Sequence, residues 1–131
     1  ASELIEKIKL NNLKWGIVTN KPYVYASKII EETPDLSSCM TLVCPDHLKK
    51  AKPSPEGILL ACNQLNLNPK EVIYFGDHQK DLMASRAAGT LTAACTYGYA
   101  LKSSDLENDD IEVRNLLEFS KTNFKSLDEH A

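Results

Sequence analysis

The sequence predicts a three-layer α/β fold in which a parallel sheet is covered by helices on both faces. Short apolar runs rich in β-branched residues alternate along the chain with segments of helical periodicity. The runs are separated by enough residues for helical crossovers, which join parallel strands in a right-handed sense. The alternation therefore indicates a mostly parallel sheet, although periodicity does not determine the order of its strands.

The first half of the chain is predicted to open with a helix over residues 1–12, because Leu4, Ile5 and Ile8 share one helix face. Ser54 and Pro55 suit the N-cap and first position of a later helix. The predicted segments after the leading helix are a strand at 15–18, a helix at 22–32, a strand at 40–44, a polar loop at 45–51 and a helix at 55–65.

The second half continues the same alternation. Gly89 is suited to end a helix in the left-handed conformation. The predicted segments are a strand at 72–75, a helix at 79–88, a strand at 91–95, a polar loop at 102–110, an edge strand at 111–113, a helix around 116–119 and a frayed tail at 122–131.

Composition limits the possible partners. The 131 residues carry 15 Lys+Arg against 18 Asp+Glu, whereas nucleic-acid binding needs a basic surface. No apolar run reaches the roughly 20 residues that span a bilayer, and the first residues lack the features of a signal peptide. The spacing of Cys39, Cys44, Cys62 and Cys95 matches neither a zinc site nor a disulfide framework. By its length the chain is one domain or part of a larger one, and we expect it to be soluble and cytoplasmic with reduced thiols, and to have neither nucleic acid nor membrane as a partner.

Polar side chains lie next to the predicted strands and helices where ligands bind in open α/β sheets. Thr19 and Asn20 follow one strand, Lys52 precedes a helix, and Asp77 and Asp81 follow another strand. A hydroxyl, backbone amides and an ammonium group suit a phosphate, whereas carboxylates suit a divalent cation. Together the residues indicate a site for a phosphate and a metal ion.

These residues belong to segments that resemble three motifs of the haloacid dehalogenase superfamily of phosphohydrolases. The segments are Val-Thr-Asn-Lys at 18–21, Lys-Pro-Ser-Pro at 52–55, and Gly-Asp-x-x-x-Asp at 76–81 with Ala-Ala-Gly at 87–89. They resemble the second, third and fourth motifs in the family's order. Thr-Tyr-Gly-Tyr at 96–99 further resembles the phosphoglycolate phosphatase branch.

The resemblance implies a role for each residue. Thr19 would bind the transferring phosphoryl group through its hydroxyl, and Asn20 through its backbone amide. Lys52 would neutralise the phosphate and a covalent aspartyl-phosphate intermediate. Asp77 would ligate Mg²⁺, and Asp81 would orient Lys52 or a metal-bound water. The implied protein is a magnesium-dependent hydrolase of a small phosphate monoester, with Thr19, Lys52, Asp77 and Asp81 as catalytic residues and a Rossmann-like core.

Two features depart from the family pattern. His78 stands where the family usually carries Ser or Thr, which we interpret as variation. No segment matches the first motif, an apolar strand followed by Asp-x-Asp, which supplies the nucleophile and the general acid and base. Asp109 and Asp110 follow a polar loop and come last in the chain. We therefore expect residues 1–131 to be the C-terminal part of the core domain, without its first strand and helical cap domain, and inactive alone.

The missing strand lies, in the family's sheet, between the strands that end at Thr19 and Asp77. Its absence predicts two unpaired edges inside the sheet. Three arrangements would satisfy them: the remaining sheet closes the gap directly, another chain fills it through self-association or an N-terminal fragment, or the first part of the same protein supplies the strand.

Simpler interpretations exist for each residue taken singly. Thr19 and Asn20 could cap a helix, Lys52 could be a solvated surface residue, and Asp77 and Asp81 could serve as a helix cap and a helix-face pair. A non-catalytic remnant or binding subunit would keep the fold without the reaction. A receiver domain places its acids before its Thr and Lys, and a dinucleotide-binding domain needs a Gly-rich turn, so neither fits.

Overall fold

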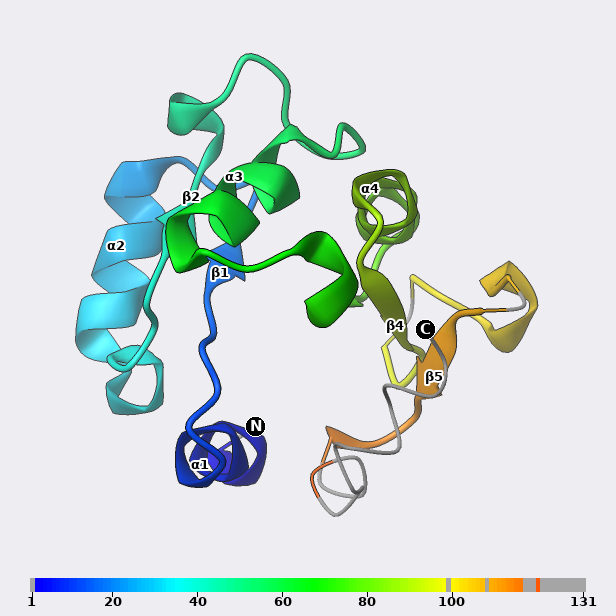
Figure 1. The fold of residues 1–131 in the computed structure, drawn as a ribbon, viewed down its shortest axis with the longest axis horizontal. Helices are drawn as coiled ribbons and strands as arrows, with labels where there is room; N and C mark the ends of the chain where they lie inside the picture. The colour runs from blue at the N-terminus through cyan, green and yellow to red at the C-terminus, as the bar shows by residue number, and fades with distance from the viewer. Residues whose placement is uncertain (1, 99, 108, 117–119, 121–131) are drawn as a thin grey trace.

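The computed structural model describes residues 2–98, 100–107, 109–116 and 120, in which strands and helices alternate along the chain (Figure 1). The helices are α1 (Ser2–Leu10), α2 (Tyr23–Glu32), α3 (Glu56–Leu65) and α4 (Gln79–Ala88). The strands are β1 (Ile17–Val18), β2 (Leu42–Val43), β3 (Ile73–Gly76), β4 (Leu91–Cys95) and β5 (Ile111–Val113). Short 3-10 turns lie at Pro34–Leu36, Pro45–His47, Pro69–Glu71 and Ser103–Asp105.

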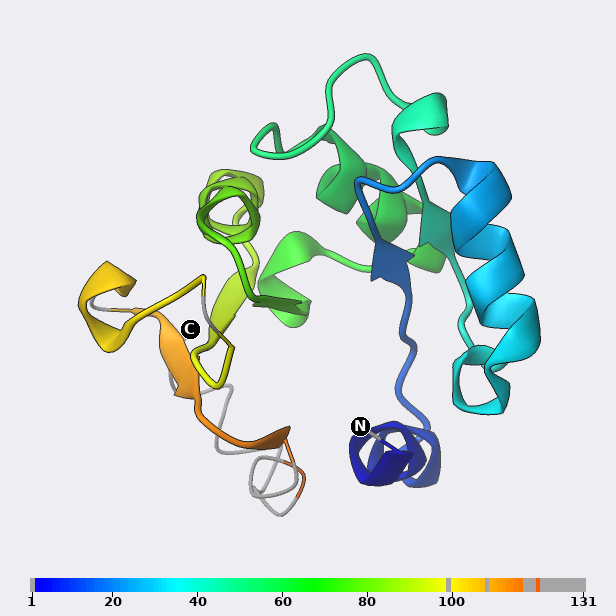
Figure 2. The ribbon, with the colours of Figure 1, turned by 180° about the vertical axis from the view of Figure 1, so that it is seen from behind.

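All strand pairs are parallel, which confirms the predicted fold class. β1 pairs with β2, with Ile17 opposite Leu42, and β4 pairs with both β3 and β5, with Ile73 opposite Leu91. Within the described residues, however, the strands form two separate sheets, β1-β2 and β3-β4-β5. Views from the front and from behind show β1 and β2 beside α2 and α3, apart from β4 and β5 (Figures 1 and 2). The first expected arrangement, in which the remaining sheet closes directly, is therefore wrong.

Two helices that pack against each other join the two sheets. α3 contacts β1 and β2, and α4 contacts β3 and β4. The two helices meet through Ile58 and Cys62 on α3 and through Ala84 and Ala88 on α4. The contact between α3 and α4 thus joins the two sheets, although β1 and β3 do not pair with each other among the described residues.

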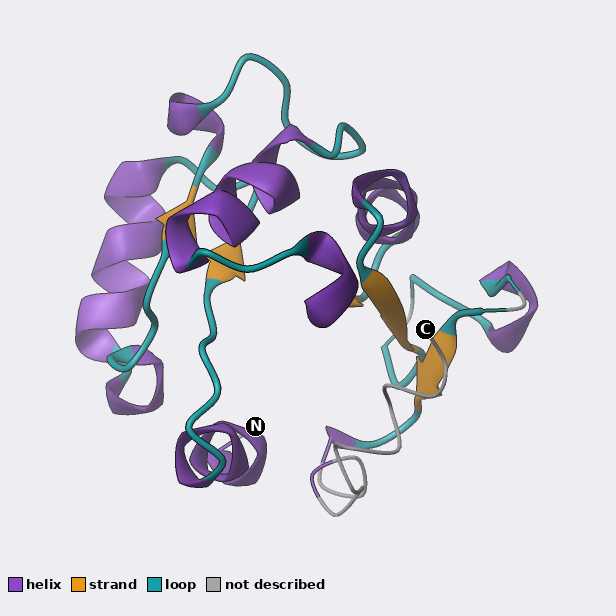
Figure 3. Ribbon diagram, in the orientation of Figure 1, coloured by secondary structure: helices purple, strands orange, loops and turns teal. Residues whose placement is uncertain are grey.

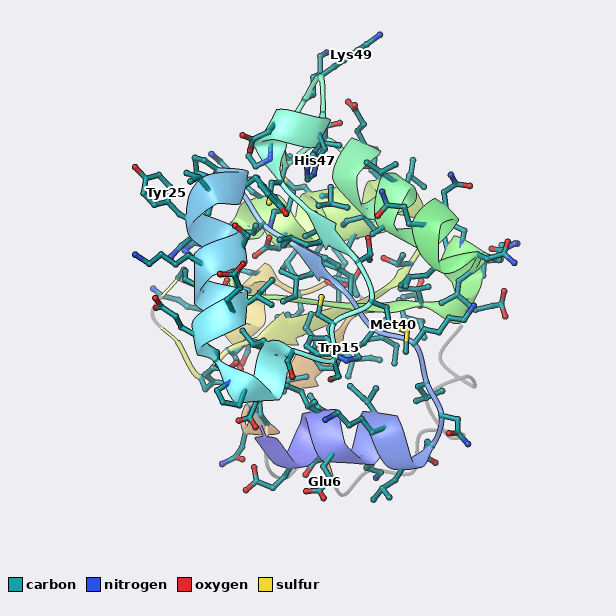
Figure 4. All side chains as sticks on the ribbon, turned by 90° about the vertical axis from the view of Figure 1, so that its left-hand side faces the viewer. Glu6, Trp15, Tyr25, Met40, His47 and Lys49 are labelled. Atoms are coloured by element: carbon teal, nitrogen blue, oxygen red, sulfur yellow. The ribbon has the colours of Figure 1, made fainter. Side chains whose placement is uncertain are left out.

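The core is layered on both faces of the sheets. On one face of β3-β4-β5, Leu4 and Ile8 of α1 pack with Ala93 and Val113. On the other face, Leu82 of α4 is fully buried beside β4. Figure 3 distinguishes these helices from the strands, and Figure 4 shows α2 and α3 on opposite sides of the β1-β2 pair.

Local signals set most helix ends. Gly89 ends α4 with φ +83°, as predicted. Helix α3 begins at Glu56, one residue later than predicted, with Pro55 at the N-cap position. Ser54 still accepts a hydrogen bond from the Glu56 amide (3.3 Å), so its hydroxyl satisfies a donor that the first turn leaves unpaired.

Some predictions concern parts of the chain that the structure describes only partly. The predicted helix around 116–119 and the tail at 122–131 lie largely outside the described residues. The four cysteines are described and form no disulfide. None of the helices in the described ranges is long and apolar enough to cross a membrane.

Candidate functional site

The site lies where β1 and β3 end. Thr19 follows β1, Asp77 follows β3, and Lys52 comes from the loop that leads into α3. In β1 the amides of Ile17 and Thr19 both donate to β2. Backbone groups of successive residues in a strand point to alternate sides, so the Val18 carbonyl points away from β2 and toward β3. The ends of the two sheets therefore face each other across this carbonyl.

Lys52 connects these two ends. Its ammonium donates to Asp81 Oδ1 at 2.5 Å, to the Tyr74 hydroxyl at 3.1 Å and to the Val18 carbonyl at 3.3 Å. Only 11% of the Lys52 side chain and 9% of the Asp81 side chain are exposed. Lys52 is thus a nearly buried charge with a carboxylate partner, which excludes its interpretation as a solvated surface residue.

Competing effects set the pKa of Lys52. Burial by itself lowers this pKa, but the Tyr74 hydroxyl and the Asp81 carboxylate outweigh burial and raise the pKa above its usual value. Burial also raises the pKa of Tyr74. At neutral pH the site therefore holds a charged ammonium group beside a neutral phenol.

Asp81 fixes the turn between β3 and α4. Its Oδ2 accepts hydrogen bonds from the backbone amides of Asp77 (3.1 Å) and His78 (3.2 Å), while its Oδ1 accepts from Lys52. A Cβ atom added to Gly76 would lie 2.3 Å from the Asp81 Cβ, so glycine is required for this close approach. Asp81 is a buried partner of Lys52 and not an exposed helix-face pair.

Asp77 offers the more accessible carboxylate. Its side chain is 62% exposed, and its Oδ1 lies 2.8 Å from His78 Nδ1. Burial by itself raises the pKa of Asp77, but the contact with His78 outweighs it, so the pKa lies below its usual value. One ligand atom from each of Asp77, His78 and Asp81 lies within 4.8 Å of the others. Because Asp81 is already bonded to Lys52 and two amides, Asp77 is the carboxylate that remains available to a cation such as Mg²⁺.

Thr19 and Asn20 form a turn beside this group. The Thr19 hydroxyl accepts a hydrogen bond from the Lys21 amide at 3.1 Å, and Asn20 is exposed. The amide of Tyr23 at the start of α2 donates instead to Asp46 (2.9 Å). Neither Thr19 nor Asn20 therefore caps α2, and both lie one or two residues beyond the Val18 carbonyl that Lys52 contacts.

The sequence reasoning missed two groups at the site, Tyr74 and Glu56. Tyr74 lies in the apolar run that predicts a strand, and the signal that could identify it is that a buried phenol needs a hydrogen-bond partner. The Glu56 carboxylate accepts from the amides of Lys49 (2.9 Å) and Lys50 (3.1 Å) and so holds the loop before Lys52. No sequence pattern indicates that contact, since it depends on how the loop folds back.

Asp110, which belongs to the acidic pair near the end of the sequence, lies apart from this group. It pairs at 2.5 Å with Arg86 in the last turn of α4, at the opposite end of the helix from Asp81. Asp110 therefore belongs to an ion pair that holds the 102–110 loop.

Tyr97 follows β4, the strand next to β3, and is half exposed. Burial first, and then the neighbouring Cys95 and Asp77, raise its pKa to about 12.

The arrangement is chemically suited to a phosphate monoester. It gathers an ammonium group, a hydroxyl, backbone amides and an available carboxylate at one edge of a parallel sheet. The cation and the N–H donors suit phosphate oxygens, and the carboxylate suits a divalent metal ion.

Comparison with known proteins agrees with this chemistry. A family described as haloacid dehalogenase-like hydrolase matches residues 1–95. An N-acetylmuramic acid 6-phosphate phosphatase of Pseudomonas putida is 42% identical over 122 residues, which cover 92% of this chain and 55% of that protein. A phosphoglycolate phosphatase of Xanthomonas campestris is 32% identical, over 78% of this chain and 46% of that protein.

Solved structures share the fold. The crystal structure of a predicted phosphoglycolate phosphatase from Haemophilus somnus superimposes with a TM-score of 0.78 at 25% identity, covering 91% of this chain and 55% of the other. The chain thus spans about half the length of the relatives that it matches. The motif order, the parallel fold and the match over residues 1–95 lead to one conclusion: the chain belongs to the haloacid dehalogenase-like hydrolase family.

Proposed function

We propose that this chain provides the phosphate-binding and magnesium-binding half of a phosphate monoester hydrolase. The observation that carries the proposal is the position of Lys52, whose ammonium lies within hydrogen-bond reach of both the end of β1 and the Asp81 carboxylate. A nearly buried cation at the open edge of a parallel sheet is suited to an anionic ligand.

Each residue has a distinct part in this proposal. The Thr19 hydroxyl and the Asn20 amide bind phosphoryl oxygens, and Lys52 neutralises the charge that develops on them. Asp81 orients Lys52, and Asp77 would hold Mg²⁺, which when bound adds positive charge next to the phosphate. The attacking carboxylate and the general acid would come from an Asp-x-Asp segment that the sequence does not contain, by way of an aspartyl-phosphate intermediate.

The substrate is proposed to be a small phosphate ester that also carries a carboxylic acid. Both named relatives point in this direction, since N-acetylmuramic acid 6-phosphate and phosphoglycolate are each phosphate esters of an acid. The relative named for the first of these is the more similar of the two, so N-acetylmuramic acid 6-phosphate is the first substrate to assay.

The proposal is tested by adding the part of a relative that contains the segments this chain does not match. The chain is mixed with the part of the Pseudomonas putida relative that lies outside its match, and release of phosphate from both esters is measured with Mg²⁺. We expect no release by the chain alone, release by the mixture, and loss of that release when a chelator removes the metal. Asp77→Asn is expected to lower the rate by about 10²-fold or more, because it removes a charged ligand.

An exposed carboxylate elsewhere provides the matched control. Asp109 is exposed in the 102–110 loop, and Asp109→Asn is expected to leave the rate unchanged. Hydrolysis by the chain alone would contradict the proposal that it lacks a nucleophile. A mixture that associates but neither hydrolyses the esters nor binds inorganic phosphate would support a non-catalytic binding subunit instead.

A further inference from the structure

The Tyr74 hydroxyl lies between the two sheets. The Tyr74 ring comes from β3 and packs against a cluster that includes Ile58 and Ala84. Its hydroxyl oxygen lies 3.2 Å from the Val18 carbonyl of β1 and 3.1 Å from Lys52 Nζ. The phenol therefore reaches from one sheet to the end of the other at the point where Lys52 is held.

The direction of each hydrogen bond follows from the groups involved. An ammonium group can only donate, so the Tyr74 oxygen accepts from Lys52. The single phenolic proton is then donated to the Val18 carbonyl. Lys52 has three N–H groups, and each has an acceptor: Asp81 Oδ1, the Val18 carbonyl and the Tyr74 hydroxyl.

We propose that Tyr74 is a positioning residue that fixes the Lys52 ammonium between the Thr19 turn and Asp77. A lysine side chain loses considerable rotamer freedom when it is held in one place, and a compact ammonium has no fixed hydrogen-bond geometry of its own. Asp81, on α4, binds the ammonium from one side, and the Val18 carbonyl at the end of β1 accepts a second N–H directly. The phenol accepts the third N–H and donates to the same carbonyl, so it holds the ammonium at the end of β1, where the proposed phosphate would lie. The contact between Tyr74 and Lys52 is independent of the proposed function; only the position of a phosphate beside the ammonium rests on it.

A purely structural role for Tyr74 predicts something different. If the phenol only joined β1 to β3 through Val18, its removal would lower stability without a specific effect on Lys52. If it positions Lys52, its removal frees that ammonium in particular. The two roles are separated by measuring the accessibility of Lys52 against that of an exposed lysine in the same molecule.

The experiment labels the folded chain with an amine-acetylating reagent and quantifies each lysine by mass spectrometry. Lys49 is the internal reference, since it is exposed and extends away from the molecule at the tip of its loop (Figure 4). In Tyr74→Phe, which keeps the ring, we expect Lys52 to label about tenfold faster, as expected for a charged group that loses a hydrogen bond. Lys49 is expected to label at the unchanged rate. Tyr25→Phe, on the exposed face of α2, is the matched control and should alter neither rate.

A second measurement separates this inference from the proposed function. Inorganic phosphate with Mg²⁺ is added during labelling. If the site binds phosphate, it should protect Lys52 in the native chain, with about tenfold more phosphate needed in Tyr74→Phe. Without protection in either protein the proposed phosphate site fails, whereas the faster labelling of Lys52 still supports the positioning role. Unchanged labelling of Lys52 in a folded Tyr74→Phe chain overturns the inference.

A measurement on the native chain covers the case in which Tyr74→Phe does not fold. In a sample with ¹⁵N-labelled lysine, a held ammonium exchanges slowly enough to give an NMR signal with a proton contact to the Tyr74 ring. We expect that signal for Lys52. If Lys52 gives no such signal or contact under conditions where the backbone is folded, the inference is wrong.

Discussion

Lys52 shows how one nearly buried charge organises the candidate site. It lies against a carboxylate of α4, a phenol of β3 and a carbonyl of β1. Removing one member of a buried ion pair leaves the other without compensation, which costs more than the intact pair contributes. The Lys52–Asp81 pair should therefore influence both stability and ligand binding.

Lys52→Met tests this contribution. Methionine keeps most of the aliphatic side chain but leaves Asp81 without its cationic partner. We expect the free energy of unfolding, measured by urea denaturation at neutral pH, to fall by about 3 kcal/mol. Lys80→Met, at an exposed position of α4, the helix that carries Asp81, should change it by less than about 0.5 kcal/mol. Equal effects of the two variants would mean that the pair is not buried in solution.

The Lys52 pair also predicts a dependence on alkaline pH. The pKa of Lys52 is raised in the folded chain, so its stabilising effect is complete below its ordinary value of 10.5 and is lost as the pH rises through the higher folded value. The difference in unfolding free energy between the native chain and Lys52→Met should therefore shrink above about pH 10.5. A difference that stays constant up to the alkaline unfolding limit would contradict the raised pKa.

At the scale of elements, two glycines of the β3–α4 unit are required for different reasons. Gly76 allows Asp81 to fold back against the strand end, whereas Gly89 ends α4 at φ +83° with open space around its Cβ position. A side chain at Gly76 would displace Asp81, but at Gly89 it would only strain the backbone.

Substitution by alanine should separate these two effects. Gly76→Ala is expected to lower the unfolding free energy by about 1–3 kcal/mol and to abolish phosphate protection of Lys52, because it moves Asp81. Gly89→Ala should cost about 1 kcal/mol and leave the protection intact. Urea denaturation and lysine labelling measure both quantities. If phosphate still protects Lys52 in Gly76→Ala, phosphate binding does not depend on the position that Asp81 has in the native chain.

Glu112, on β5, joins the residues that follow β4 and β5 to the turn at Ser103. Its Oε2 accepts from Thr96 (2.7 Å), Ser103 (2.9 Å) and Arg114 (2.9 Å). Arg114 first, and then the two hydroxyls, lower the pKa of Glu112 from 4.5 to about 2. A carboxyl group with a lowered pKa stabilises the fold above its ordinary value and loses that effect as the pH falls.

The native chain should therefore lose stability as the pH falls from 4.5 to about 2, and part of that loss should be absent in Glu112→Gln. Unfolding followed by circular dichroism across this range measures the effect. Glu31→Gln, at an exposed position on α2, is expected to leave the pH profile unchanged. Parallel profiles for the native chain and Glu112→Gln would exclude a lowered pKa at this position.

At the scale of the whole molecule, the two sheets leave facing strands that are each paired on one side only. Among the described residues β1 pairs only with β2, and β3 only with β4. Unpaired edges accept further strands, and a strand between β1 and β3 would pair with both. We propose that an N-terminal segment, or a second copy of the chain, completes the sheet at this place.

Hydrogen exchange tests this completion. On addition of the remaining part of the Pseudomonas putida relative, the amides of β1 and β3 that face the gap should exchange at least about tenfold more slowly, because they gain backbone partners. The amides of β4 are the control, since this strand already lies between two neighbours. Slower exchange at high chain concentration without the added part would indicate self-association. Unchanged exchange under both conditions would contradict completion by either partner.

Local sequence signals predicted several elements as the structure has them. α4, β4 and β5 have the predicted bounds, because glycine, the apolar runs and helix periodicity act over a few residues. β1 and β2 are shorter than predicted. Their backbone bonding begins with the Met40 amide and the Trp15 carbonyl, but the regular ladder covers only Ile17–Val18 and Leu42–Val43.

The fold class and the order of the polar residues at the strand ends could be predicted from the sequence, because both depend on local periodicity and spacing. The contacts of Lys52 with Val18, Tyr74 and Asp81 could not, because these residues are 34, 22 and 29 residues away from it in the chain and the fold brings them together. The tertiary structure also decided that the strands form two sheets. Both outcomes depend on the packing of α3 against α4, which fixes distances between segments that no local pattern relates.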